Sequence, residues 1–233
     1  MKTTFKTGLA CILLLLTFSC RKENGNLQSS VSDNDASYID AGKYAVVSIG
    51  NQKWMLKNLD VTHYRNGDRI PQVKDPTQWA NLTTGAWCWY NNDSAFGAIY
   101  GRLYNWYAVN DPRGLAPTGW HISSNEEWDT LSLFLANRVG GQLKDTGTIE
   151  AGTGLWYAPN SGATNESGFT GLPGGYHGTD GVFYAMGYSG YWWNSAEYGT
   201  LNAWYSTVHY TNRKLVNAYA AKGVGLSVRC IKN

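Results

Sequence analysis

The stretch "GWHISSNEEWDTL", residues 119–131, holds the densest group of ionisable side chains in the chain. His121, Glu126, Glu127 and Asp129 fall within this short segment, and His and carboxylate groups serve in metal sites and in acid–base catalysis. A zinc site on a helix needs a second His four residues after the first, and that position holds Asn125. We therefore expect no metalloprotease-type centre here and leave the metal content of the protein unassigned.

The same residues have the pattern of a helix start. Ser124 is a favoured N-cap, and Glu127, three residues later, completes a capping box. Acidic residues in the first turn are stabilised by the helix dipole. We predict that the helix ends at the glycine pair 140–141 and that it buries a stripe made of Trp128, Leu131 and Leu135.

Other segments predict an α+β fold with two main helices and short antiparallel strands joined by long ordered loops. The pair Gly50-Asn51 separates two strand-like runs and predicts a hairpin. Asp75 followed by Pro76 predicts a short capped helix. Within "YGRLYNWYAVNDP", residues 100–112, apolar spacing from Tyr100 to Ala108 predicts the other main helix, which Asn110-Asp111-Pro112 ends. The chain beyond residue 141 alternates short apolar runs with turns, so we expect strands and aromatic-rich loops there, the loops lying within residues 176–210.

The N-terminal residues indicate an exported lipoprotein. Basic residues and a short apolar run at positions 1–19 predict a signal peptide, and Cys20 stands where a bacterial lipobox has its lipidated, palmitate-bearing cysteine. Residues 20–40 are polar and predict a flexible tether after that cysteine. The domain is expected to span residues 41–233, and the protein is expected at the outer membrane, on its periplasmic or its surface-exposed side.

Cysteine usage leaves two thiols in the expected domain. Cys88 and Cys230 form an even pair in an oxidising compartment, and a disulfide between them is the expectation. Two buried free thiols are the alternative.

The charge composition of the chain indicates which classes of partner it can bind. With Lys2 and Lys6 assigned to the signal, the rest of the chain carries 17 basic and 17 acidic residues, and no dense basic cluster predicts binding to nucleic acid. Hydrolase chemistry has weak candidates: Ser189 with a histidine, or the isolated carboxylates Glu166 and Glu197.

Several segments together resemble a known family. They are "WCWYNND", "YGRLYNWYAVNDPRGLAPTGWHISSNEEW", "TNESGFTGLPGGY", "YWWNSAEY" and "GLSVRCIKN". The series resembles the Fibrobacter succinogenes major paralogous domain over roughly residues 45–233. The resemblance implies a C-type lectin-like fold on a secreted protein or lipoprotein, with formylglycine-generating, sulfatase-modifying domains as enzymatic relatives.

Departures from those relatives lead us to expect no enzyme. The formylglycine-generating enzymes use two cysteines close together near the C-terminal end, and this chain has only Cys230 there. No cofactor is expected. Ca²⁺ is an open alternative because "NNDSAFG", residues 91–97, offers oxygen ligands without the EF-hand pattern.

The aromatic residues carry the functional expectation, because sugar C–H faces stack on Trp and Tyr rings. In an extended strand the adjacent Trp192 and Trp193 point to opposite faces, so we expect one in the core and the other exposed. The candidate ligand-binding residues are Tyr176, Trp192, Trp193, Trp204 and Tyr205. The expected function is a lectin-like module, anchored to the envelope through its lipid, that binds a glycan or another surface macromolecule. Two alternatives remain: a structural or adhesin component that binds envelope proteins, and a formylglycine-generating-type oxidoreductase.

Overall fold

A computed structural model describes residues 44–136 and 138–233. The expected signal peptide, Cys20 and the tether lie outside these residues. The described chain is a mixture of few helices and short antiparallel strands, which agrees with the predicted α+β class. Within this part of the chain, no helix has the length and hydrophobicity needed to cross a bilayer.

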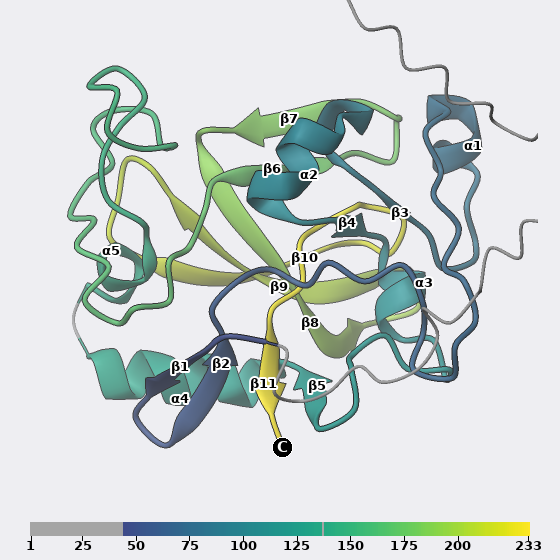
Figure 1. The fold of residues 1–233 in the computed structure, drawn as a ribbon, viewed down its shortest axis with the longest axis horizontal. Coiled ribbons are helices and arrows are strands. Elements are labelled where there is room, and N and C mark those ends of the chain that lie inside the picture. Colours follow the sequence, from purple (N-terminus) through teal and green to yellow (C-terminus); the bar gives the residue numbers. More distant parts are fainter. Residues whose placement is uncertain (1–43, 137) are drawn as a thin grey trace, which may run out of the picture. The chain divides into compact units, whose positions relative to one another are not determined.

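The two ends of the domain meet in one sheet. Strand β1 (Val46–Ile49) pairs with β2 (Gln52–Met55) through a tight turn at Gly50, as the sequence predicted. Strand β11 (Cys230–Lys232) lies between β2 and β5 (Trp120–Ile122), and both neighbours are antiparallel to it. Figure 1 shows this four-stranded sheet beside the longest helix, with the C-terminus at its rim.

A second sheet forms most of the C-terminal half. Its order is β10-β9-β8, with β8 at Ser189–Tyr198, β9 at Asn202–His209 and β10 at Leu215–Ala221. Two small sheets pair β3 (Trp87–Cys88) with β4 (Leu103–Tyr104) and β6 (Gly174–His177) with β7 (Phe183–Met186). The expectation of aromatic loops in this region was therefore largely wrong, because most of those aromatic residues lie in paired strands.

The predicted helix start at residue 124 is confirmed. Helix α4 (Asn125–Leu135) has Ser124 as its N-cap, and Glu127 completes the capping box. Trp128 and Leu131 are fully buried. The short helix α1 (Pro76–Ala80) is capped by the Asp75 side chain, which accepts a hydrogen bond from the Gln78 amide.

The predicted end of helix α4 was wrong. Helix α4 ends at Leu135, and the glycine pair 140–141 lies inside a separate short helix, α5 (Val139–Leu143). A Cβ atom on Gly140 would clash with the Lys214 carbonyl, and one on Gly141 would clash with the Gly162 carbonyl. These glycines therefore allow close backbone packing and do not cap a helix.

The predicted helix over residues 100–112 was also wrong. The chain forms helix α2 (Ser94–Tyr100) after the 3-10 turn η2 (Tyr90–Asn92), then strand β4, then helix α3 (Trp106–Val109). Gly101 has a φ of 77°, a left-handed conformation that ends α2. Tyr104 then exchanges backbone hydrogen bonds with Leu226, so tertiary strand pairing outweighed the helical spacing of apolar residues.

Three groups of buried side chains make the core. One joins the β2–β11–β5 sheet to β4 and α3, one lies between α4 and the sheets on either side of it, and a smaller one surrounds β3 and α1. All three consist of residues between Ile49 and Ile231, so we expect residues 41–233 to fold as a unit by themselves.

A buried arginine connects the first two of these groups. Arg229 is 1% exposed, and its Nη1 atom donates to the carbonyl oxygens of Met55, Leu56 and Phe169 at 2.8–2.9 Å. Its Nε and Nη2 atoms both donate to Oδ1 of Asn58. No carboxylate of the described chain pairs with it, and the guanidinium lies 4.2 Å from the centre of the Phe169 ring. Burial lowers its pKa to about 9, so the group is cationic at neutral pH.

Arg229→Met should destabilise the domain by about 3–5 kcal/mol, because three buried carbonyl groups lose their donor. We expect a fall in Tm of roughly 10 °C in thermal unfolding followed by circular dichroism. Lys232→Met, an exposed change three residues away, is the matched control and should shift Tm by only a degree or two. A Tm for Arg229→Met equal to that of the control would contradict this role.

Candidate functional site

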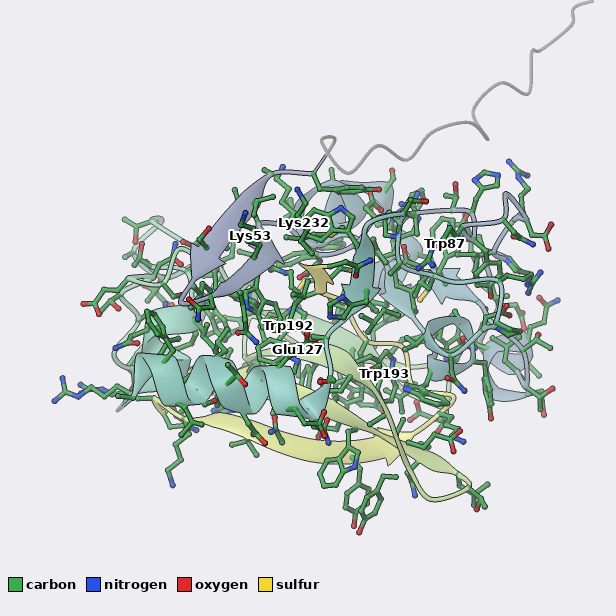
Figure 2. All side chains as sticks on the ribbon, turned by 90° about the horizontal axis from the view of Figure 1, so that it is seen from below. Lys53, Trp87, Glu127, Trp192, Trp193 and Lys232 are labelled. Carbon is green, nitrogen blue, oxygen red and sulfur yellow. The ribbon has the colours of Figure 1, made fainter. Side chains whose placement is uncertain are left out.

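Strand β8 is covered on both faces where it carries its tryptophan pair. Trp192 and Trp193 do point to opposite sides, as predicted, but both are 0% exposed. Figure 2 shows both side chains inside the structure, with Trp192 close to α4. The expectation that one of them is exposed was wrong, because α4 covers one face of the strand and α3 with β4 covers the other.

Each tryptophan is fixed by its indole N–H. Trp192 donates to Oδ1 of Asn58 at 2.8 Å, and its ring packs on Trp128 and Phe169 with centroids 5.8 and 5.3 Å away. Trp193 donates to the carbonyl of Tyr104 at 2.8 Å. These two candidate ligand-binding residues are therefore anchors of the core and cannot contact a ligand in this conformation.

Beyond the tryptophans, β8 leaves the core. The register between β8 and β9 shifts between Trp193 and Glu197, which is an irregularity of the β-bulge kind. From there the β8–β9 hairpin carries exposed side chains, of which Leu201 in the turn is 75% exposed. The bulge thus separates a buried half of the strand from an accessible half.

Three aromatic side chains meet on this accessible half, and we call them the aromatic platform: Tyr198, Trp204 and Tyr219. Tyr198 and Tyr219 are 41% and 51% exposed and stack with ring centroids 4.0 Å apart and planes 17° apart. Trp204 meets both rings edge-on, at 4.9 and 6.1 Å. Strand alternation places the amide side chains of Asn202 and Asn217 on the same face.

Only Trp204 of this platform was predicted as a ligand-binding residue. Tyr198 and Tyr219 come from β8 and β10, and the antiparallel register that opposes Tyr219 to Trp204 brings them together. The sequence predicted strands beyond residue 141 but not how they pair, so no local signal placed Tyr219 beside Trp204.

The other two candidates lie in a different cluster. Tyr176 stacks on Tyr184 at 5.2 Å and meets Tyr191 edge-on, and Tyr191 meets Tyr205. Tyr205 in turn packs against buried Trp193. Burial raises the pKa of both Tyr176 and Tyr205 above the ordinary value. Tyr176, Tyr191 and Tyr205 are each only partly exposed, so this row continues the core to the surface.

The expected disulfide is not formed. Cys88 and Cys230 are both buried free thiols and belong to different hydrophobic groups. Burial raises the pKa of each thiol, for Cys230 to about 12, so neither is a ready nucleophile. Cys88 lies 3.4 Å from Nδ1 of His177, whose ring stacks on Phe183 at 4.1 Å.

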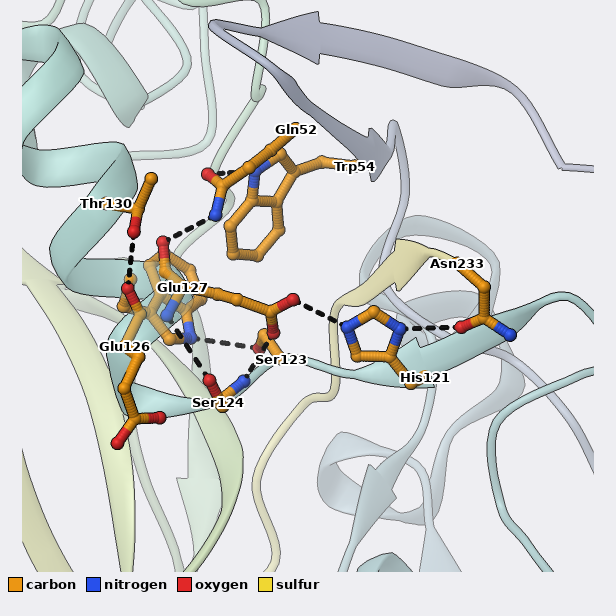
Figure 3. A network of polar contacts seen from close by, with 10 residues as sticks. Gln52, Trp54, His121, Ser123, Ser124, Glu126, Glu127, Thr130 and Asn233 are labelled. Atoms are coloured by element: carbon orange, nitrogen blue, oxygen red, sulfur yellow. Dashed lines mark hydrogen bonds and ion pairs between the residues drawn. The ribbon is translucent and has the colours of Figure 1, made fainter.

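The histidine of the opening cluster, His121, has two polar partners. Nε2 of His121 lies 2.6 Å from Oε1 of Glu127, and Nδ1 lies 2.7 Å from Oδ1 of Asn233 (Figure 3). Burial lowers the pKa of His121, but the bonds to Glu127 and Asn233 outweigh burial, and the pKa is above 6.5. The pair borders a hollow of about 480 Å³. Both carboxylate oxygens of Glu127 are engaged, one by His121 and one by the Ser124 amide. The contact between His121 and Glu127 therefore stabilises the start of helix α4.

Within the described residues, the candidates for a metal site and for hydrolase chemistry are not brought together into a site. Among residues 44–136 and 138–233, no group of three His, Cys, Asp or Glu side chains is placed to hold a metal. In the "NNDSAFG" segment, the Asp93 carboxylate caps α2. Glu197 pairs with Lys222 at 2.8 Å, and Ser189 is buried.

Comparison with known proteins identifies the family. The model of the Fibrobacter succinogenes major domain matches residues 47–232, which is most of the chain. The chain belongs to the Fibrobacter succinogenes major domain family. No curated protein and no solved structure matches it. The match begins at β1 and ends in β11, so the family domain includes both the aromatic platform and the Arg229 core.

The two thiols give a direct test of the cysteine geometry. In soluble protein spanning residues 41–233, purified without reductant, we expect almost no reaction with a thiol reagent while the domain is folded. After denaturation, two thiols per chain should react, because burial alone protects them. Titration with 5,5′-dithiobis(2-nitrobenzoate) measures both numbers, and zero thiols after denaturation would mean that Cys88 and Cys230 do pair.

Proposed function

We propose that this protein is an envelope-anchored lipoprotein whose C-type lectin-like, non-catalytic domain binds a glycan through the aromatic platform. The observation that carries the proposal is the exposed stack of Tyr198 and Tyr219 at the accessible half of the β8–β10 sheet. Together with Leu201, these rings form an apolar surface outside the core, and such surfaces on soluble domains mark binding sites.

The chemistry of the platform suits a sugar better than a flat protein surface. Stacked rings offer a face to sugar C–H groups, and the nearby amides of Asn202 and Asn217 can donate to and accept from hydroxyl groups. The rings are already ordered by contact with one another, which lowers the entropy lost on binding. A structural or adhesin role remains the alternative, in which the same surface binds an envelope protein.

A catalytic role of the formylglycine-generating type has less support. That chemistry needs reactive thiols, and in this chain both thiols are buried, apart and disfavoured as thiolates. Localisation at the outer membrane rests on the signal peptide and on Cys20.

The platform residues should control glycan binding. Tyr219→Ala and Trp204→Ala should each weaken binding by about 1–2 kcal/mol, roughly 5- to 30-fold, through loss of stacking area. Soluble protein spanning residues 41–233 would be screened on a glycan array and on cell-envelope fractions, with and without EDTA to reveal a need for Ca²⁺. Tyr188→Ala is the matched control, because Tyr188 is 42% exposed but stacks elsewhere, on Tyr157.

Two results would count against the proposal. No glycan binding by the unmodified domain, or binding that the platform variants and the control reduce equally, would remove the platform as a sugar site. Recovery of envelope proteins that sugars do not displace would favour the adhesin alternative.

The lipid anchor has its own test. Cys20→Ser in the full chain should abolish incorporation of radiolabelled palmitate and move the protein from the membrane fraction to the soluble fraction, since one thiol carries the lipid. Cys11→Ser is the control and should leave both unchanged. Labelling that survives in Cys20→Ser would show that the anchor is elsewhere or absent.

A further inference from the structure

A group of cations lies at the other end of strand β10. Arg138, Arg213 and Lys214 line a surface hollow of about 500 Å³ between the C-terminal half of α4, the start of α5 and the start of β10. Arg138 and Arg213 also line an adjoining hollow of about 230 Å³ with Gln142 and Thr164. We call these two adjoining spaces the cation hollow.

These cations form no ion pair with the part of the chain that the structure describes. Within the described residues, none of the three lies within ion-pair distance of a carboxylate. Asp129 borders the hollow, but its Oδ1 accepts a hydrogen bond from Asn217. Glu166 borders the smaller space and is likewise unpaired. An anion bound in this hollow would have a favourable Coulomb interaction with the three cations that border it.

Local contacts hold Arg213 in place. The side chain of Arg213 lies directly on the backbone of Gly162, where a Cβ atom would clash with its Nε and Cδ atoms. The carbonyl of Arg213 accepts from the Gly140 amide at 3.0 Å. Behind it, buried Lys144 donates to the carbonyls of Ser161, His209 and Asn212. Burial chiefly, and then the charge of Arg213, lower the pKa of Lys144 to about 8.

The hollow and the aromatic platform share one strand and one face. Leu215, which borders the hollow, and Tyr219 of the platform are four residues apart on β10, and alternation puts them on the same side. At roughly 3.3 Å per residue, the separation is about 13 Å, which an oligosaccharide of a few sugars can span. β10 is the edge strand of its sheet, so one side of this path is open.

We propose that the ligand is an acidic polysaccharide that follows β10, with a sugar ring on the aromatic platform and a carboxylate or sulfate group in the cation hollow. The guanidinium groups supply the paired N–H donors that such oxyanions accept. This inference rests on the glycan-binding function proposed above and names the class of glycan.

A matched set of polymers tests the inference. Dextran, dextran sulfate and carboxymethyl dextran share one backbone and differ in charge, and their binding to soluble protein spanning residues 41–233 would be measured by biolayer interferometry. We expect the two anionic polymers to bind at least tenfold more tightly than dextran. The double variant Arg138→Ala/Arg213→Ala should remove that difference and leave any binding to dextran unchanged.

The control separates a site from general attraction. Lys57→Ala/Lys74→Ala changes the net charge by the same amount at exposed positions, and Lys74 precedes α1, which Figure 1 shows at the opposite end of the domain from α5. This control should keep the preference for anionic polymers. An equal loss in both double variants would overturn the cation hollow as a site.

The outcomes also separate this inference from the proposed function. Equal binding of neutral and anionic polymers would overturn the acidic class and leave glycan binding standing. Binding of the anionic polymers could be lost in Arg138→Ala/Arg213→Ala and yet unchanged in Tyr219→Ala. That result would overturn both the path along β10 and the aromatic platform as parts of this site. No binding to any of the three polymers would overturn the inference, while the glycan array decides the proposed function.

Discussion

The hydrogen bonds between Arg229 and Asn58 hold together segments that are far apart in the sequence. Asn58 accepts from Arg229 and from the Trp192 indole with one oxygen, and its amide donates to the Tyr100 carbonyl and the Ser227 hydroxyl. A buried cation without a counterion is stable only while neutral acceptors satisfy its donors. All the segments that supply these acceptors must therefore be in their native positions together. This requirement ties β2, α2, β8 and the chain leading into β11 to one arrangement.

The accessible surface depends on that arrangement through β8. Asn58 fixes Trp192, the Tyr104 carbonyl fixes Trp193, and both faces of the strand are closed at that point. The bulge that follows changes the register, and the strand continues beyond the helices that covered it. The buried half thus supports the exposed half, which is also held by the Glu197–Lys222 ion pair and by the hydrogen bond from the Ser195 amide to the Ser123 carbonyl. A binding surface carried by a strand of this kind keeps its geometry better than one on a free loop.

Sequence reasoning succeeded where the controlling interaction is local and failed where it is not. The cap at Ser124 and the turn at Gly50 involve residues only a few positions apart, so residue type alone specified them. The segment 100–112 had helical spacing, but pairing of Tyr104 with Leu226, far along the chain, made part of it a strand. Burial of both Trp192 and Trp193 required knowing that two different layers cover β8. Tyr219 joined the site only through the register of β10 on β9.

The cations beside β10 also admit a purely protective role, because charged residues near an edge strand discourage pairing with another chain. Two features go beyond that role. A protective charge works best on a free, solvated side chain, whereas the arm of Arg213 is packed against Gly162. Protection also needs no concavity, whereas Arg138 and Arg213 border two adjoining hollows. Guanidinium groups that border a concave surface are suited to an oxyanion, and this hollow lies at the start of the strand that carries Tyr219.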